Sequence, residues 1–194
     1  MPDSLDLLTL LAVRLRSRGT SDVIAITVSD LAGQNVDDAV VASLATAIAL
    51  EQVRVRGDER RYSLTPAGEA ELAALLAADL DGPSRADATV AYEAFLPLNR
   101  RFLAACVGWQ DDPAEIDEFI ELIEALVPVL DALTAVRTRF GSYAPRVVAA
   151  LAEATADPRW IDSPTRDSVH TVWFELHEHL LATLGRRRAD EPVS

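Results

Sequence analysis

The stretch from residue 51 to residue 69 constrains the fold more than any other part of this chain. Within it, Val-Arg-Val-Arg (53–56) and Arg-Tyr-Ser-Leu (61–64) alternate apolar and polar residues, and Gly57-Asp58 between them supplies turn residues. Alternation of this kind is typical of half-buried β-strands. Two such runs around a turn predict an antiparallel β-hairpin.

The residues that follow the second strand predict the start of a helix. Thr65 is a good N-cap, and Pro66 occupies the first helical position, where its missing N–H costs nothing. An Ala- and Leu-rich segment then runs to Leu80. We therefore expect strand, turn, strand and helix in immediate succession.

The expected hairpin is basic, although the chain is acidic. Arg54, Arg56, Arg60 and Arg61 all belong to it, whereas the whole chain has a net charge of -13. Local positive charge in an acidic protein marks a candidate contact with nucleic acid.

Helical patterns precede the hairpin. Leu5 to Arg18 has an amphipathic pattern, and Thr27 to Ala32 predicts a short helix with Ser29 as its N-cap. Asn35 is placed to cap a third helix that runs to Leu50, with Asp38 three residues later in a capping-box-like arrangement. The expected order is helix, helix, helix, hairpin, helix.

This order and its residues resemble the MarR-like winged-helix regulators of transcription, over residues 1–80. The matching elements are Leu31-Ala32, the spacing of Val36, Val40 and Leu44, Glu51-Gln52-Val53 before the hairpin, and Tyr62-Ser63-Leu64-Thr65-Pro66-Ala67-Gly68 after it. The resemblance implies a winged helix-turn-helix fold, with the hairpin as the wing. It also implies a DNA-binding regulator that acts as a homodimer, because two-fold regulators read two half-sites.

The resemblance also implies which residues contact double-stranded DNA. The helix from Asn35 would lie in the major groove, and the wing arginines would clamp phosphates or the minor groove. The expected DNA-binding residues are Gln34, Asn35, Ser43, Thr46, Arg54, Arg56, Arg60 and Arg61.

The expected recognition helix departs from that pattern. It contains Asp37 and Asp38 and no arginine, and negative charge at its leading end repels phosphate. Acidic residues in a first turn also stabilise a helix through its dipole, which is the structural explanation. The alternative function is therefore a protein-interaction adaptor whose winged helix no longer binds DNA.

Composition narrows the class of protein. With 49% hydrophobic residues in 194, the chain can form one large or two small folded domains. The single cysteine, Cys106, excludes an internal disulfide and fits a reducing compartment. Neither a secretion signal nor a membrane span is recognisable, so we expect a cytoplasmic protein without membrane contact.

The second part of the chain, after a joint at 81–85, has the pattern of an all-helical domain. Helices are expected at 86–107, at 113–140, at 145–156, and from Ser163 to Leu184 before Gly185. The expected fold class is mainly α with a small β-hairpin wing. A winged helix-turn-helix domain (1–80) is followed by a four-helix antiparallel bundle (86–188) that serves dimerisation or effector sensing. The polar residues from Arg186 predict a frayed tail.

The last of these helices carries all three histidines. His170 and His177 lie seven residues apart on one face, with Trp173 between them. Metal ligands on one helix are usually three or four residues apart, so we predict no metal site. Two alternatives stay open: packing within the bundle, or a small-molecule pocket of aromatic and polar groups. The pocket would be lined by Tyr92, Asn99, Trp109, Tyr143, His170, Trp173 and His177.

An enzyme is not expected. The sequence has no Gly-rich phosphate loop and no nucleophile elbow, and Cys106 lies in an apolar run that predicts a packed thiol. We expect no cofactor. The function predicted from the sequence is thus a cytoplasmic, DNA-binding transcriptional regulator. Its alternatives are the adaptor and a small-molecule-binding protein with no DNA role.

Overall fold

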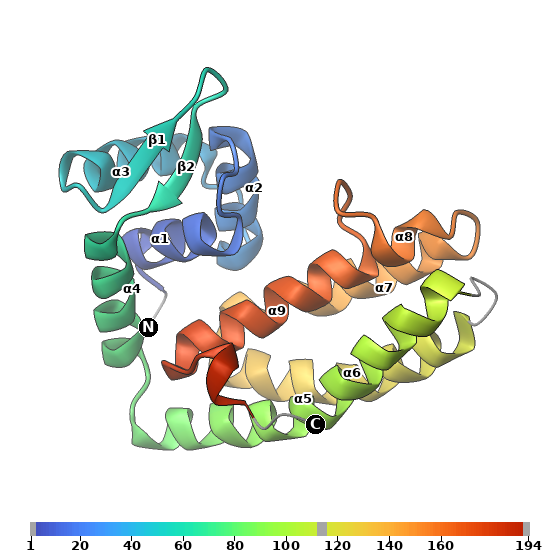
Figure 1. Ribbon diagram of the computed structural model, residues 1–194. Helices are drawn as coiled ribbons and strands as arrows, with labels where there is room; N and C mark the ends of the chain where they lie inside the picture. Colours follow the sequence, from blue (N-terminus) through green and yellow to red (C-terminus); the bar gives the residue numbers. More distant parts are fainter. Residues whose placement is uncertain (1–2, 112–115, 192–194) are drawn as a thin grey trace. The chain divides into compact units, whose positions relative to one another are not determined.

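The computed structural model describes residues 3–111 and 116–191, and it is mainly helical with one small antiparallel hairpin (Figure 1). The chain forms two compact units. Unit 1 holds the residues up to Asp81 together with 181–187, and unit 2 holds 82–180 and the residues from Arg188 onward. The expectation of a mainly α protein with a small hairpin is confirmed.

Unit 1 is built around its first helix. Its elements are α1 (Leu5–Leu15), α2 (Ser21–Ala32), α3 (Asp37–Ala49), β1 (Val53–Arg56), β2 (Arg61–Leu64) and α4 (Pro66–Asp79). Helix α1 contacts α2, α3, α4 and β2, and every residue from Leu7 to Val13 is buried. Burial on all sides explains why this helix has so few polar residues in its centre.

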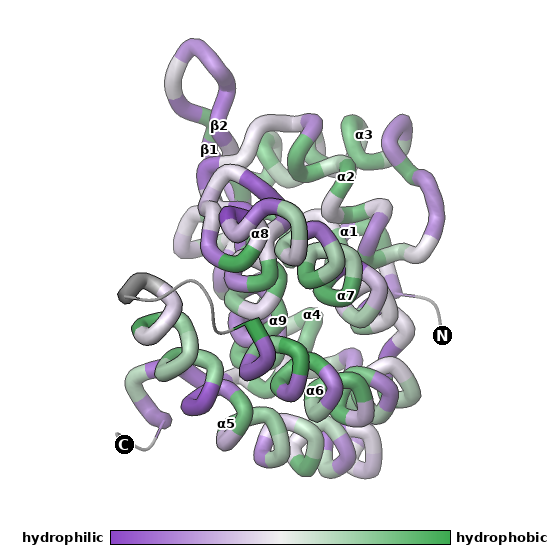
Figure 2. The backbone as a smooth tube through the Cα atoms, turned by 90° about the vertical axis from the view of Figure 1, so that its right-hand side faces the viewer, coloured by the Kyte–Doolittle hydropathy of each residue, from purple (hydrophilic) through white to green (hydrophobic). Residues whose placement is uncertain are grey.

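The hairpin has one apolar and one basic face. Val53 pairs with Leu64 and Val55 with Tyr62, while Arg56 pairs with Arg61. A loop of residues 57–60 joins the strands, and its backbone has positive φ at Gly57 (74°) and at Arg60 (50°). In Figure 2 this loop is drawn mostly in the colour of hydrophilic residues. The predicted hairpin is confirmed, and its alternation follows from having one buried face.

The start of α4 also follows the sequence pattern. The Gly68 amide donates a hydrogen bond to Thr65 Oγ1 at 3.2 Å, so Thr65 caps the helix, and Pro66 opens it. A Cβ on Gly68 would lie only 2.0 Å from the carbonyl oxygen of Gln52. Position 68 must therefore be glycine because the backbone before β1 passes directly against the first turn of α4.

The starts of α2 and α3 differ from the expectation. Helix α2 begins at Ser21, and Ser29 lies inside it rather than at its N-cap. The Ser29 hydroxyl accepts a hydrogen bond from the Val36 amide and donates one to Asp37, so it stabilises the start of the next helix. Asn35 Oδ1 accepts a hydrogen bond from the Asp37 amide. Helix α3 begins at Asp37. A capping side chain contributed from the preceding helix leaves no local signal in the sequence.

Unit 2 is helical throughout its described residues. Its elements are α5 (Gly82–Asp111), α6 (Ile116–Val136), the short 3-10 helix η1 (Thr138–Phe140), α7 (Tyr143–Ala154), α8 (Arg159–Asp162), the first twelve residues of α9 (Val169–Leu184), and η2 (Arg188–Asp190). Helix α6 packs against both α5 and α7, and α8 packs against α7. None of the described helices is long and apolar enough to span a membrane.

The division between the two units falls between Asp81 and Gly82, within the expected joint at 81–85. Helix α5 nevertheless begins at Gly82, earlier than expected, and Pro83 is tolerated within a first helical turn. One expected helix start in unit 2 is wrong. Ser163 does not cap the last helix, which begins only at Val169, where the Ser168 hydroxyl accepts a hydrogen bond from the Thr171 amide. Pro113, expected to open a helix, lies outside the described residues. Gly185, with φ of 64°, does end α9.

Candidate functional site

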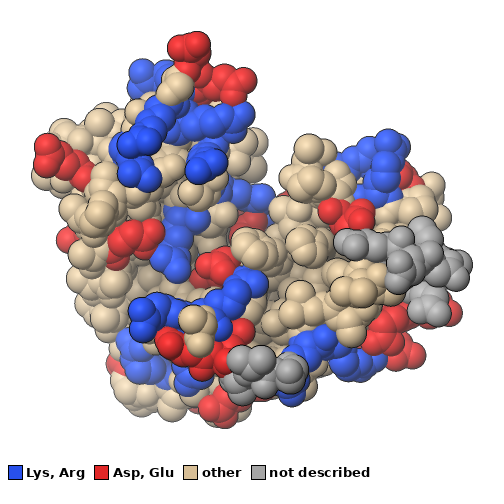
Figure 3. All heavy atoms as spheres, in the orientation of Figure 1, with Lys and Arg blue, Asp and Glu red and all other residues tan. Residues whose placement is uncertain are grey.

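Exposed arginines occupy the outer face of the hairpin. Arg54 and Arg56 on β1 and Arg61 on β2 share the face opposite the buried Val53 and Tyr62. Arg60 lies in the adjoining loop and is also exposed. Figure 3 shows basic side chains gathered over the hairpin, with acidic ones at its tip.

The turn between α1 and α2 is bonded to this hairpin. The Arg18 amide donates to the Tyr62 carbonyl at 2.8 Å, and the Tyr62 amide donates to the Gly19 carbonyl at 2.9 Å. Arg61 Nη1 donates to the Arg18 carbonyl at 2.9 Å. Arg18 thereby joins the hairpin arginines in one continuous region. We call this region the arginine surface; it consists of Arg18, Arg54, Arg56, Arg60 and Arg61.

The arginines of this surface are not equivalent. The Arg61 guanidinium binds Glu59 as well as the Arg18 carbonyl, so its position is fixed by the protein. Over residues 3–111 and 116–191, no ion-pair partner is found for Arg54, Arg56 or Arg60. These three guanidinium groups can therefore bind an external anion without breaking an internal pair.

Helix α3 offers little hydrogen-bonding chemistry on its outer face. Ser43, expected to contact DNA, is only 7% exposed and donates a hydrogen bond to Asp6 on α1 at 3.1 Å. It faces the interior because it falls on the same side of α3 as the buried Val40 and Ala47. Thr46 is exposed, but its hydroxyl donates to the Ala42 carbonyl at 3.0 Å.

The exposed residues of α3 are mostly apolar. Val41 is 66% exposed, and Ala42, Ala45 and Ala49 lie exposed on the same helix. Gln34 and Asn35, just before the helix, are exposed as expected. The Asn35 amide donates to the carboxylate of Asp37, which also accepts from Ser29. The Asp37 carboxylate thus binds two polar side chains beside the start of α3.

In unit 2 the structure brings six of the seven expected pocket residues into one packed region between α5 and α9, extended at one end by α6. The Trp173 indole stacks on Phe102 with centroids 4.2 Å apart, and its Nε1 donates to Asn99 Oδ1 at 3.0 Å. Phe95 contacts both Trp173 and His177. Around these groups lie Tyr92 and His170, and Trp109 packs edge-on against Phe119 of α6. These residues form an aromatic layer rather than the lining of an open cavity.

The seventh residue, Tyr143, belongs to a different cluster. Its hydroxyl lies 3.1 Å from His179 Nδ1, and Arg139 Nε donates to His179 Nε2 at 3.2 Å. Complete burial, with the nearby Arg139 charge, holds the pKa of His179 well below its ordinary value. The imidazole is therefore neutral, with its proton on Nδ1. No local pattern in the sequence marks His179 or Arg139 as partners.

A second polar cluster fixes the loop before α9. The Arg146 guanidinium makes two hydrogen bonds to Asp167, at 2.7 and 2.8 Å, and two to Glu175, at 2.9 and 3.0 Å. These carboxylates outweigh the effect of burial and raise the pKa of Arg146. The pairing holds Asp167 in the loop, which explains why α9 begins after it.

Within the described residues, the end of the chain is bound at Glu191 rather than frayed. Glu191 Oε1 accepts a hydrogen bond from Tyr92 Oη at 2.5 Å and lies 2.6 Å from His177 Nε2. Burial alone would raise the pKa of Glu191, but the bonds to Tyr92 and His177 outweigh it and hold the pKa below its ordinary value. The expectation of a loose tail was wrong because Glu191 finds partners on two distant helices.

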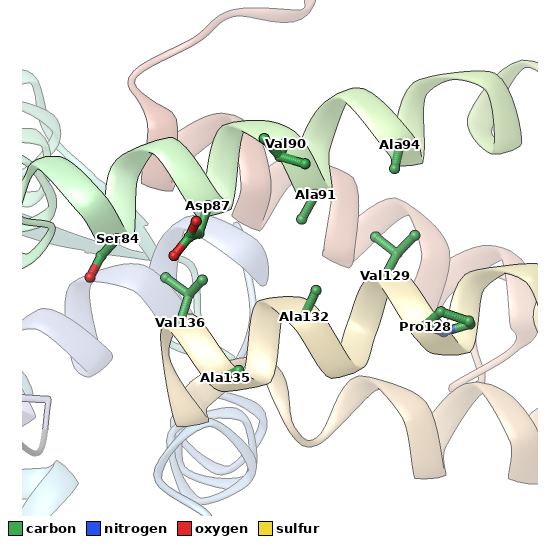
Figure 4. Close-up of a pocket in the computed structure, with 10 residues that line it drawn as sticks. All are labelled: Ser84, Asp87, Val90, Ala91, Ala94, Pro128, Val129, Ala132, Ala135 and Val136. Atoms are coloured by element: carbon green, nitrogen blue, oxygen red, sulfur yellow. The ribbon is translucent and has the colours of Figure 1, made fainter.

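An open groove lies between α5 and α6, with a volume of about 560 Å³. Ala91 and Ala94 on α5 face Val129 and Ala132 on α6 across it, and Asp87 points from α5 toward α6 (Figure 4). The volume falls within the ordinary range of ligand sites. None of the seven expected pocket residues lines this groove.

Metal and thiol chemistry find no support among the described residues. In residues 3–111 and 116–191, no three His, Cys, Asp or Glu side chains are grouped so that they could hold an ion. Burial, and secondarily the charge of Asp162, raises the pKa of the Cys106 thiol to about 11. At neutral pH this cysteine is protonated and therefore a poor nucleophile.

No protein-family model, curated protein or solved structure matches this chain.

Proposed function

We propose that unit 1 is a winged-helix module that binds double-stranded DNA, and that the protein regulates transcription. The observation that carries this proposal is the arginine surface. It combines a β-hairpin with the turn that follows α1 and carries three guanidinium groups with no ion pair among the described residues. The three helices before the hairpin and the capped helix after it have the order of a winged helix.

The charges favour the hairpin as the main contact with DNA. Unit 1 and unit 2 are both acidic, so general attraction to nucleic acid is weak, and binding must come from a local patch. Phosphate contacts from arginine supply affinity that does not depend on base sequence. A dimer that presents two hairpins would double those contacts, which fits the two-fold symmetry of such regulators.

Helix α3 would contribute shape and methyl contacts more than hydrogen bonds. Its exposed Val41, Ala42, Ala45 and Thr46 carry methyl groups, which suit contact with the methyl group of thymine. No exposed side chain of α3 can make the bidentate hydrogen bonds by which Arg, Asn or Gln read a base. We therefore expect modest sequence discrimination, with Gln34 as the nearest candidate for a base contact.

The test is the salt dependence of DNA binding. Genomic fragments are first selected on the purified protein, and the affinity of the best fragment is measured against salt for the wild type and for R54A/R56A. Each lost phosphate contact lowers the magnitude of the slope of log K against log salt by about 0.9. The double variant should therefore lose about 2 units of slope for each hairpin bound.

A matched control tests whether the change in slope is specific to the hairpin or follows from the loss of any exposed positive charge. Arg159 is an exposed arginine of unit 2, so R159A removes a positive charge elsewhere. It should leave the slope unchanged. Equal slopes for wild type and R54A/R56A would refute the assignment of DNA contact to the hairpin.

One observation favours the adaptor as a second function. The exposed face of α3 is apolar, with Val41 66% exposed, and such faces are more typical of protein contacts than of DNA contacts. The adaptor becomes the leading function if well-folded protein enriches no DNA fragment at low salt. In that case a stoichiometric protein partner should be recovered from the native extract with the wild type, and V41D should abolish its recovery. On either proposal unit 2 would serve dimerisation or the sensing of a small-molecule effector.

A further inference from the structure

The most unusual polar contact in unit 2 is made by Glu191. Its carboxylate oxygen Oε1 lies 2.5 Å from the Tyr92 hydroxyl on α5 and 2.6 Å from His177 Nε2 on α9. The side chain of His177 is 3% exposed, and Tyr92 is 1% exposed. A phenol and an imidazole from two different helices thus converge on one point, and a carboxylate occupies that point.

The segment that carries this carboxylate lies at the surface. Glu191 follows the short helix η2 (Arg188–Asp190), whose residues are all exposed. Arg188 binds Glu178 and lies over the ring of Phe174, at the surface of α9. Segments with few buried apolar contacts open at low free-energy cost. The carboxylate is therefore bound by two helices, although the short helix before it is exposed.

We propose that Tyr92 and His177 form a binding site for a carboxylate group, that Glu191 fills this site as an internal ligand, and that a small free carboxylate can take its place. The wall beside the site is apolar, since the ring of Phe95 lies 5.3 Å from that of His177. The ligand class is therefore a carboxylate on a short apolar body. Exchange of ligand for Glu191 removes the contacts of Glu191 with α5 and α9 and thereby loosens the segment 188–191.

The charges around the site agree with this assignment. The groups that face Glu191 are Tyr92 from α5, His177 from α9 and, through space, Arg188 of its own segment. Their combined effect keeps the pKa of Glu191 below its ordinary value despite burial, so the site favours an ionised carboxylate over a neutral group. An amide of the same shape should bind much more weakly.

Chemical rescue tests the site in the intact 194-residue chain. E191A removes the internal carboxylate and leaves space of its size beside Tyr92 and His177. Propionate has the size of the missing group, and propionamide is its neutral isostere. Each is titrated into E191A at constant ionic strength. The readouts are the thermal midpoint and the imidazole nitrogen resonances of His177, with His179 as an internal reference.

The expected result is specific for the carboxylate. Propionate should shift the His177 resonances of E191A in a saturable way and raise the thermal midpoint of this variant, while the His179 resonances stay unchanged. Propionamide should neither shift the His177 resonances nor raise the midpoint. In Y92F/E191A the affinity for propionate should fall at least about tenfold, as expected for loss of a hydrogen bond to a charged group. Equal effects of propionate and propionamide, or no effect of propionate on His177, would overturn the proposal.

Wild-type protein supplies a test that does not depend on a variant's folding. Arg186, Arg187 and Arg188 are exposed trypsin sites just before Glu191. Propionate should accelerate trypsin cleavage there several-fold relative to propionamide, because it frees the segment. An unchanged cleavage rate at concentrations that saturate E191A would show that carboxylates do not displace the tail. None of these readouts involves DNA, so the outcome is independent of the proposed function.

Discussion

Replacing Arg146 by methionine should destabilise unit 2 strongly. The guanidinium binds both Asp167 and Glu175, and the Glu175 side chain is only 3% exposed. In R146M the Glu175 carboxylate loses its buried cation, while Asp167, whose side chain is 42% exposed, can still be hydrated. Breaking a buried ion pair by removing one partner costs about 3–5 kcal/mol, and most of that cost should come from Glu175.

The assay is urea unfolding followed by tryptophan fluorescence. Trp109, Trp160 and Trp173 all belong to unit 2, so the signal reports on that unit alone. R146M should lose about 3–5 kcal/mol of unfolding free energy at pH 7.

Two controls decide whether the reasoning is right. The double variant R146M/E175M replaces the buried pair by apolar groups and should recover most of the lost stability. R101A breaks only exposed pairs with Glu118 and Glu121 and should leave the unfolding free energy unchanged within error. If R146M is no less stable than R101A, or if the double variant is no better than R146M, the buried pair does not have the role assigned to it.

Three further predictions concern other parts of the chain. The buried His179 has a pKa well below its ordinary value, so on acidification the unfolded state takes up a proton before the folded state does. The free energy of unfolding should therefore fall as the pH drops below about 6.5, by up to about 1.4 kcal/mol per pH unit. H179Q should flatten this pH dependence, as measured by urea titrations at pH 7.5 and 5.5. G68A should destabilise unit 1 by more than about 2 kcal/mol, measured by calorimetry, because the new Cβ would meet the Gln52 carbonyl. G57A should cost less, because a Cβ at position 57 meets no other atom and strains only the backbone. T65A should cost about 1 kcal/mol through loss of the α4 cap, and T65S should restore it. Each expectation has an outcome that would contradict it. These outcomes are, in order, a pH profile of H179Q equal to that of wild type, a G68A variant as stable as wild type, and equal stabilities of T65A and T65S.

The sequence alone determined the elements that depend on neighbouring residues. The hairpin, its turn at Gly57, the Thr65 cap and the stop at Gly185 all appear where the sequence predicts them. Each is governed by interactions over two to four residues, namely strand alternation, a turn conformation or a side-chain cap. Such interactions can be recognised in the sequence because both partners lie within one short window.

Only the tertiary structure decided which polar side chains reach one another. Nothing near Ser43 indicates that it turns inward to Asp6, and nothing near Asp167 indicates that Arg146 holds it in a loop. Glu191 likewise finds Tyr92 ninety-nine residues away. A buried polar group must find a hydrogen-bond partner, but which partner it finds depends on how distant helices pack together. The arginines of the hairpin could therefore be located from the sequence, whereas the carboxylate site of unit 2 could not.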